Sequence, residues 1–323
     1  MGRRDVMPAW VGQVASQGVY AGLVVLGATC VLFALTLAIP GNPAQILLGP
    51  QATPEAVEAF TRLMGLDRPV WERLGRFLWN AARGEFGTDV ISGRPVMALV
   101  WEVLPHTLAL TAAAMGLAVG LGVPLGCLAA LRPGGWLDTA TAVLSVAVIA
   151  LPSFVVAVAL LLVFSTWLHW LPVLGAGRAG VGDEALRLVL PAVSLAVGWV
   201  GYIARLLRAS LLEALGEPHA RTARAYGVAE RRVVGKYALR LAMAPTLAVL
   251  GIGVGQMLGG AVFAEVVFAR PGLGTLVYDA ISARNYPVVQ AAVLVVVGLY
   301  ALVNLCVDAA LVWLDPRAAG SAG

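Results

Sequence analysis

A basic segment of this sequence, which we call the basic cluster, combines several arginines with a turn-forming glycine. Such a combination suits specific contact with a partner. Residues 213–245 lie between two apolar stretches and contain Arg221-Thr222-Ala223-Arg224-Ala225-Tyr226-Gly227. Helical patterns precede and follow Gly227, and glycine is favoured just past a helix end, where φ is positive. The pattern predicts a helix, a glycine turn and a second short helix on a membrane surface. An ordinary basic loop that only sets membrane topology is the alternative.

The sequence contains no familiar arrangement for covalent or metal chemistry. A GxxxxGK[ST] phosphate loop is absent, because Lys236, the only lysine, follows Gly235 but Glu230 replaces the glycine five residues earlier. HExxH, CxxC and nucleophile-elbow motifs are also absent. The histidines are far apart in sequence, and the cysteines lie in apolar stretches: His106, His169, His219, Cys30, Cys127 and Cys306. We therefore predict no catalytic residue, no disulfide, no metal site and no cofactor bound by this chain.

Two carboxylates lie at the margins of apolar stretches, Glu265 and Asp308. Acids within membrane segments are costly and are treated first as functional candidates. Glu265 either pairs with an arginine or backbone groups, or lines the exit of a transport path, and the sequence does not separate these roles. We expect a structural role for Asp308.

The elements that position these residues are membrane helices. The chain has 323 residues, of which 60% are hydrophobic and 12% charged, against about 25% charged in soluble domains; its mean hydropathy is +0.86. Six stretches without Asp, Glu, Lys or Arg are each long enough to cross a bilayer. We predict an all-α polytopic membrane protein whose six transmembrane helices cover residues 20–39, 107–131, 140–164, 188–207, 244–267 and 288–311. The first stretch lacks an A-x-A cleavage site, so we expect a retained helix.

The arginines predict the orientation of these helices. Positive side chains in short loops favour the cytoplasmic side of a membrane. With the N-terminus inside, Arg3, Arg4, Arg132, Arg317 and the basic cluster are cytoplasmic, and fewer basic residues fall in the short outer loops. We predict an inner-membrane protein with both termini in the cytoplasm. Residues 40–106 then lie outside, where Thr53 as helix cap and Pro54 at the first helical position predict a small helical extracytoplasmic subdomain.

Glycines recur every four residues in the fifth predicted helix, at Gly251, Gly255 and Gly259. Small residues at this spacing allow membrane helices to approach closely. The partner is either another helix of this chain or a helix of a second membrane subunit, and the sequence favours neither.

The basic cluster resembles the loop with which permeases of binding-protein-dependent ABC importers grip their ATPase. The family pattern is Glu-Ala-Ala, three residues, Gly, nine residues, then Ile-x-Leu-Pro. Ala223, Gly227, Tyr237 and Leu239 fall on the second Ala, the Gly, the Ile and the Leu of this pattern.

The departures from the pattern are typical of one branch of that family. Arg221, Thr222 and Arg240 replace its Glu, first Ala and Pro. The dipeptide, oligopeptide and nickel permeases carry Arg-Thr-Ala-Arg-Ala at this place. Further strings similar to that branch include Leu151-Pro152-Ser153-Phe154 and Pro271-Gly272-Leu273-Gly274.

The resemblance implies a type I ABC importer permease fold and a set of partners. It implies a second homologous permease in a heterodimer, two ABC ATPases that bind ATP and Mg²⁺, and an extracytoplasmic solute-binding protein, with no nucleic acid. It divides the chain into residues 1–103 with the first helix and outer subdomain, a core of five helices at 104–317 with the coupling loop at 208–243, and a tail at 318–323.

The expected cargo is a di- or oligopeptide, and nickel or a nickel chelate is the alternative. An ATP-independent secondary transporter would show inverted repeats and broken helices with central charges, and the sequence indicates neither. A structural membrane protein would leave the basic cluster without a purpose.

Overall fold

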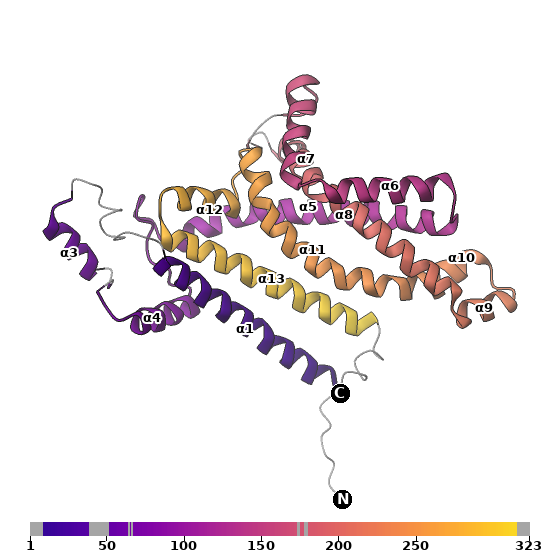
Figure 1. Ribbon diagram of the computed structural model, residues 1–323, viewed down its shortest axis with the longest axis horizontal. Coiled ribbons are helices and arrows are strands. Elements are labelled where there is room, and N and C mark those ends of the chain that lie inside the picture. Colours follow the sequence, from indigo (N-terminus) through magenta and orange to yellow (C-terminus); the bar gives the residue numbers. More distant parts are fainter. Residues whose placement is uncertain are drawn as a thin grey trace, which may run out of the picture.

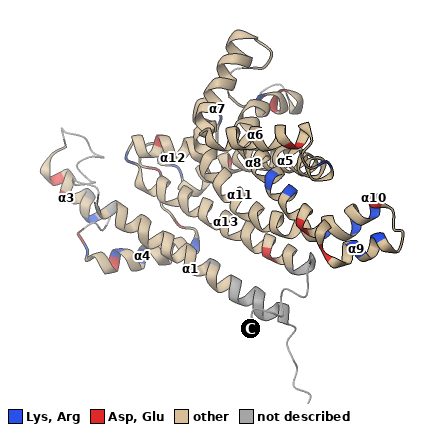
Figure 2. Ribbon diagram, turned by 45° about the vertical axis from the view of Figure 1, so that its right-hand side comes forward, with Lys and Arg blue, Asp and Glu red and all other residues tan. Residues whose placement is uncertain are grey.

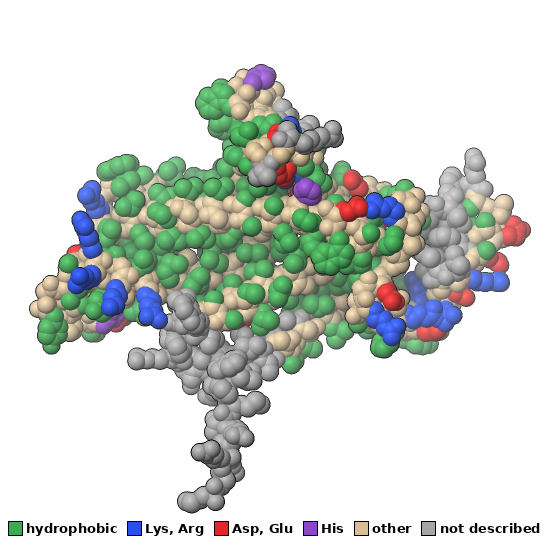
Figure 3. Space-filling view, turned by 180° about the vertical axis from the view of Figure 1, so that it is seen from behind, with side chains coloured by type: hydrophobic (Ala, Val, Ile, Leu, Met, Phe, Trp, Pro, Cys, Tyr) green, Lys and Arg blue, Asp and Glu red, His purple; other side chains and the backbone are tan. Residues whose placement is uncertain are grey.

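The computed structural model describes residues 9–38, 52–63, 65, 67–172, 175–177 and 180–314. These residues are helical apart from loops and one isolated bridge between Thr88 and Pro95. The long helices run side by side along the molecule (Figure 1) and are α1 (Ala9–Ala38), α5 (Val96–Leu131), α8 (Val181–Gly216), α11 (Leu239–Val267) and α13 (Tyr286–Leu314). Apolar side chains cover the sides of these long helices, and charged side chains gather toward the two ends of the molecule (Figure 3).

Five helical segments are long and apolar enough to cross a membrane, and a sixth span is counted if one bent pair is joined. This confirms the predicted all-α membrane fold within the described ranges. Arg3, Arg4 and Arg317, which contributed to the predicted orientation, lie outside those ranges.

The third predicted span is broken, so the prediction of one continuous helix over residues 140–164 is wrong. Helix α6 (Trp136–Ala150) is followed by α7 (Ser153–Leu160), which continues as the π-helix η1 (Leu161–Trp167), and the two halves meet at 98°. Pro152 has no N–H and disfavours helical geometry in the residue before it; accordingly, Leu151 is extended, with φ −85° and ψ 124°. A broken span therefore exists, although no charged residue lies at the break.

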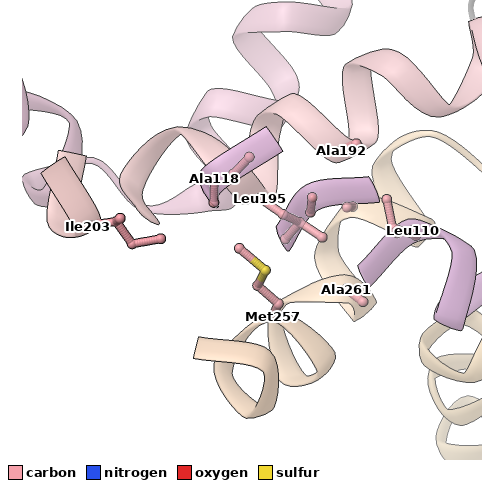
Figure 4. Close-up of a cluster of buried hydrophobic side chains, with 10 residues drawn as sticks. Leu110, Ala118, Ala192, Leu195, Ile203, Met257 and Ala261 are labelled. Carbon is pink, nitrogen blue, oxygen red and sulfur yellow. The ribbon is translucent and has the colours of Figure 1, made fainter. Parts of the chain in front are cut away.

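The centre of the helix bundle is the contact of α5 with α8 and α11. The ten buried side chains of this core are Leu110, Ala114, Ala118, Ala192, Leu195, Ala196, Ile203, Met257, Ala261 and Ala264 (Figure 4). Small residues bring α5 against α8: a Cβ added to Gly126 would lie 2.7 Å from the Ala204 carbonyl oxygen. Close backbone approach of this kind stabilises helix pairs in lipid through van der Waals contact.

The three predicted packing glycines of α11 differ from one another. A Cβ added to Gly251 would lie 2.7 Å from Asn304 Oδ1, and one added to Gly255 would collide with the Tyr300 ring. Both therefore face α13 of the same chain. Among the described residues, a Cβ on Gly259 would meet nothing within 4 Å, so this position makes no close packing within that part of the chain.

The segment between α1 and α5 contains two amphipathic helices. Helix α3 (Pro54–Leu63) begins where predicted, and its Ala56 N–H donates to Thr53 Oγ1 at 3.3 Å. Helix α4 (Val70–Arg83) packs on α1 through stacked Phe33 and Phe77 rings, whose centroids are 6.0 Å apart. The loop after α4 is tied to the turn between α12 (Leu273–Ser282) and α13 by a hydrogen bond from the Asn285 amide to Asp89.

Candidate functional site

The basic cluster folds as a short helix closed by a glycine turn. Helix α9 (Pro218–Ala225) starts directly after the extended Glu217 and has proline at its first position. At its end the Gly227 N–H donates to the Arg224 carbonyl at 2.9 Å and the Val228 N–H to the Ala223 carbonyl at 3.1 Å. This pair of bonds is the Schellman arrangement, which needs a left-handed residue. Gly227 supplies it, with φ 74°, as the sequence predicts.

The second helix of the cluster is the beginning of a membrane helix, which corrects the prediction of a separate short helix. Helix α10 (Glu230–Arg232) continues through the π-helix η2 (Val233–Ala238) into α11 without a break. The backbone stays helical at both joins, with φ −59° at Val233 and −61° at Leu239. The second half of the cluster and α11 therefore form one continuous helix.

Arg224 braces α9 against its neighbours. Its Nε and Nη2 donate to the two carboxylate oxygens of Glu230 at 3.1 and 2.8 Å, and its Nη1 donates to the Leu215 carbonyl at 3.0 Å. Ala220, Ala223 and Val233 form a small buried cluster beneath. One guanidinium thus joins the end of α8, helix α9 and the start of α10.

The remaining predicted coupling residues divide between an outer and an inner face. Arg221, Thr222 and Tyr237 are exposed, and Tyr226 between them is 84% exposed. Ala223 and Leu239 instead face the interior, where Leu239 packs on the core formed by α8 and α11. Arginines and Lys236 surround the outer face, which lies at one end of the long helices (Figure 2). This face is accessible for docking to another protein.

A cavity of about 430 Å³ opens at the break between α6 and α7. Its lining comes from α6, α7, α8 and α11: Val148, Ile149, Leu151, Ser153, Ser194, Leu195, Val197, Gly198, Trp199, Tyr202, Val249, Ile252, Gln256, Met257 and Gly260. No lining residue carries a charge, and polar groups are few. The sequence analysis missed this cavity, although Pro152 after Leu151 is the signal for the break that forms it.

Glu265 does not line the cavity. It is 1% exposed and accepts hydrogen bonds from Thr107 Oγ1 at 2.6 Å and from the N–H groups of Gly274 and Thr275 at 2.7 and 3.1 Å. The carboxylate therefore holds the turn between α11 and α12 against α5. This geometry favours the structural alternative for Glu265.

Asp308 is half-buried between α1 and α13, beside Tyr20 and Asn304. Within the described part of the chain no side chain forms a hydrogen bond or ion pair with it. The described residues also contain no group of three His, Cys, Asp or Glu placed to hold a metal ion.

The sequence analysis did not predict two ion pairs that join distant segments of the chain. Asp138 at the start of α6 pairs with Arg208 of α8, and Glu184 of α8 accepts a 2.5 Å bond from Arg270, which is 1% exposed. The partners are 70 and 86 residues apart. Helix α8 is thus held by a charged contact near each of its ends.

Comparisons with known proteins agree over most of the chain. Residues 122–320 match the family described as binding-protein-dependent transport system inner membrane component, and residues 15–111 match the N-terminal component of such systems. The chain is 40% identical over 288 residues to a probable peptide ABC transporter permease of Sinorhizobium fredii, covering 88% of this chain and 92% of that protein.

Two further relatives and one solved structure extend the comparison. A dipeptide transport permease of Alkalihalophilus pseudofirmus is 34% identical, with 91% of this chain and 95% of that protein covered. A glutathione transport permease of Escherichia coli is 37% identical, with 86% and 89% covered. The inward-facing MetNI methionine ABC transporter shares the fold, with a TM-score of 0.55 and 22% identity over 68% of this chain and 97% of that one.

Proposed function

Because this chain belongs to the family of binding-protein-dependent inner-membrane transport components, we propose that it is the permease subunit of an ATP-driven importer of di- and oligopeptides. The observation that carries the proposal is the match to this family together with relatives named for peptide, dipeptide and glutathione transport. The chain is not itself an enzyme, and it works with ATPase and binding-protein partners.

We further propose the composition of the complex. Two ATPase subunits bind ATP and Mg²⁺, and one of them docks on the outer face of α9, around Arg221, Thr222 and Tyr226. A second, homologous permease completes a heterodimer, and an extracytoplasmic binding protein delivers the cargo. In this arrangement α9 and both termini are cytoplasmic, and α3 and α4 are extracytoplasmic. The accessible basic face of α9 supports the docking site.

The structure of α9 suits the transmission of force. Its Schellman end and the Arg224 brace make it a rigid extension of α8 and α10 rather than a loose loop. When the ATPases close, the pull on α9 moves α8, whose Trp199 and Tyr202 line the cavity. The cavity then alternates between the two sides of the membrane, as in other two-state transporters.

The cavity chemistry fits a cargo with variable side chains. An uncharged lining with few polar groups holds no particular side chain strongly, and weak binding in a path lets the cargo leave. Selectivity then resides in the binding protein. Peptides share a backbone but differ in side chains, so such a path transports many of them.

Uptake in cells that lack this chain tests the cargo. We expect loss of radiolabelled dipeptide uptake with normal nickel accumulation, and recovery of uptake when the chain is restored. Loss of nickel accumulation alone would assign the nickel alternative, and loss of only sugar or phosphate uptake would contradict the proposal. Cells that regain uptake with the chain but not with a variant lacking residues 218–225 would link the activity to α9.

A further inference from the structure

We propose that the Asp138–Arg208 ion pair is a positioning clamp that makes α6 move together with α8, so that force on α9 reaches the bend at Leu151–Pro152. The inference rests on the proposed function, because it takes α9 as the place where the ATPases act. It assigns to these two residues a role in coupling, without contact with the cargo or with ATP.

The clamp is a two-pronged contact at the start of α6. Asp138 is 5% exposed, and its carboxylate accepts bonds from Arg208 Nε and, at 2.7 Å, from Arg208 Nη2. The Gly134 N–H also donates to it at 2.8 Å, which fixes the carboxylate on its own turn. A fork of this kind fixes direction as well as distance, because both bonds must stay aligned.

The clamp lies close to the coupling helix. Arg208 is about two turns, or roughly 12 Å, before Gly216 at the end of α8. Only Glu217 separates α8 from α9. A displacement of α9 therefore reaches Arg208 along a continuous helix whose end is braced by Arg224.

Helix α6 connects the clamp to the cavity. A Cβ added to Gly201 of α8 would lie 2.9 Å from the Ser145 Cα, so the two helices touch at backbone distance. Ser145 lies seven residues beyond Asp138 along α6. The helix ends five residues further on, at Ala150, and Val148, Ile149 and Leu151 at this end line the cavity. The close contact at Gly201 holds the two helices together, and the fork adds a directional bond that resists sliding along the helix axis. The ion pair thus converts two packed helices into one lever that ends at the bend.

Spin labels on the two helices test this rigid movement. Val143 of α6 is 63% exposed, and Glu213 of α8 is exposed. In the complete reconstituted complex, with Cys30, Cys127 and Cys306 replaced, Val143→Cys and Glu213→Cys are labelled and their separation is measured by pulsed electron resonance. We expect the same narrow distance distribution without nucleotide and after trapping with ATP and vanadate. A distance that changes between these states in the otherwise wild-type complex would overturn the clamp.

The same measurement in Asp138→Ala shows what the ion pair contributes. We expect a broader or nucleotide-dependent distribution, because only the apolar packing between the two helices remains. The matched control is Arg132→Ala, an exposed arginine beside the same turn, which is expected to leave the distribution unchanged. An unchanged distribution in Asp138→Ala would also overturn the proposal.

The amount of dipeptide transported per ATP hydrolysed measures coupling, and a purely structural role of the ion pair would not change this ratio. In proteoliposomes with labelled dialanine as the probe, Asp138→Ala and Arg208→Ala should lower dipeptide transported per ATP hydrolysed by about tenfold, within the usual range of coupling between sites, while ATP hydrolysis persists. The double variant should be no worse than either single one, and Arg208→Lys should be intermediate. Additive losses, or equal losses of ATP hydrolysis and transport, would contradict the clamp.

Failure of the clamp and failure of the proposed function give different results. A complex whose Val143–Glu213 distance stays the same with and without nucleotide and broadens in Asp138→Ala, but which transports no dipeptide, retains the clamp and loses the proposed cargo. A complex that transports dialanine with unchanged coupling in both alanine variants retains the proposed function and loses the clamp.

Discussion

Thr107 of α5 and Glu265 of α11 are joined by a 2.6 Å hydrogen bond between side chains 158 residues apart. The Thr107 oxygen also accepts the Leu273 N–H at 2.8 Å. Thr107→Val keeps the shape but leaves a buried carboxylate oxygen and a backbone N–H without this partner, and we expect a loss of about 1–3 kcal/mol of stability. Thr107→Ser should retain most of it. Thermal unfolding of the purified complex measures the difference, and equal midpoints for Val and Ser would contradict the role of the hydroxyl.

The second prediction concerns the backbone conformation at Gly227, at the end of α9. A Cβ at this position would meet nothing within 4 Å, so substitution there is penalised by its φ of 74° and not by crowding. We expect Gly227→Val to distort the end of α9 at a cost of roughly 1–2 kcal/mol. Co-purification of the ATPases and dipeptide transport should fall while membrane insertion persists.

Gly227→Asn is the matched variant, because asparagine tolerates left-handed geometry better than a β-branched residue does. It should retain most of the transport. Wild-type transport in Gly227→Val would count against a coupling role for this turn.

The proposed orientation is tested by labelling single cysteines in a background without Cys30, Cys127 and Cys306. Glu58 of α3 and Arg232 of α10 are both exposed. We expect a membrane-impermeant maleimide to label Glu58→Cys from outside intact cells, and Arg232→Cys only after the membrane is opened. Labelling of Arg232→Cys in intact cells would invert the topology.

We expect Asp89 to make the segment between α1 and α5 sensitive to acid. Burial, the largest influence, raises the pKa of this carboxyl, but hydrogen bonds from Ser92, the Ile91 N–H and Asn285 together hold it below its usual range. A carboxyl whose pKa is lowered by folding stabilises the fold above its unfolded pKa of about 3.9 and loses that contribution as pH falls through the lower folded value. We therefore expect the temperature of the unfolding midpoint to decrease when the pH is lowered below about 4.

Asp89→Asn should be less stable at neutral pH and should lose less stability on acidification. Unfolding midpoints measured against pH provide the check. Asp67→Asn, at an exposed carboxylate of the same segment, serves as the control and should follow the wild-type curve. Parallel curves for wild type and Asp89→Asn would contradict the prediction.

A fixed charge in the cavity should create selectivity against like charge. Gln256→Glu is nearly isosteric and places a carboxylate in an uncharged lining. Charges in such surroundings interact strongly, and we expect transport of an acidic dipeptide to fall about tenfold more than that of a neutral one, a difference of about 1.4 kcal/mol. Gln256→Asn should lower both equally. Equal loss for both cargoes in Gln256→Glu would place Gln256 outside the path.

The membrane helices were predictable because lipid leaves an apolar chain little choice but helix. Thr53-Pro54 and Gly227 were predictable from local geometry alone. The break after Leu151 was not, because prolines 105, 124, 191 and 245 also occur in this chain and remain inside helices. Whether a proline breaks a membrane helix depends on whether neighbouring groups satisfy the freed backbone, which a single sequence does not show.

The predicted site was recovered only in part for a similar reason. The local sequence pattern predicted the position of α9. It did not predict that Arg224 would hydrogen-bond to neighbouring segments while Arg221 remained exposed. The Asp138–Arg208 contact and the cavity depend on the register between α6 and α8. That register follows from the close approach at Gly201, which has no local signature.

The length of α8 has a consequence for the membrane itself. Its 36 residues rise about 54 Å, whereas the hydrocarbon core of a bilayer is only about 30 Å thick. The surplus must project into water or be absorbed by tilt, because a span longer than the local hydrocarbon thickness tilts, kinks or thickens the bilayer around it. Shorter or longer acyl chains therefore change the height at which α9 stands above the membrane, and with it the reach that an ATPase needs to engage the importer.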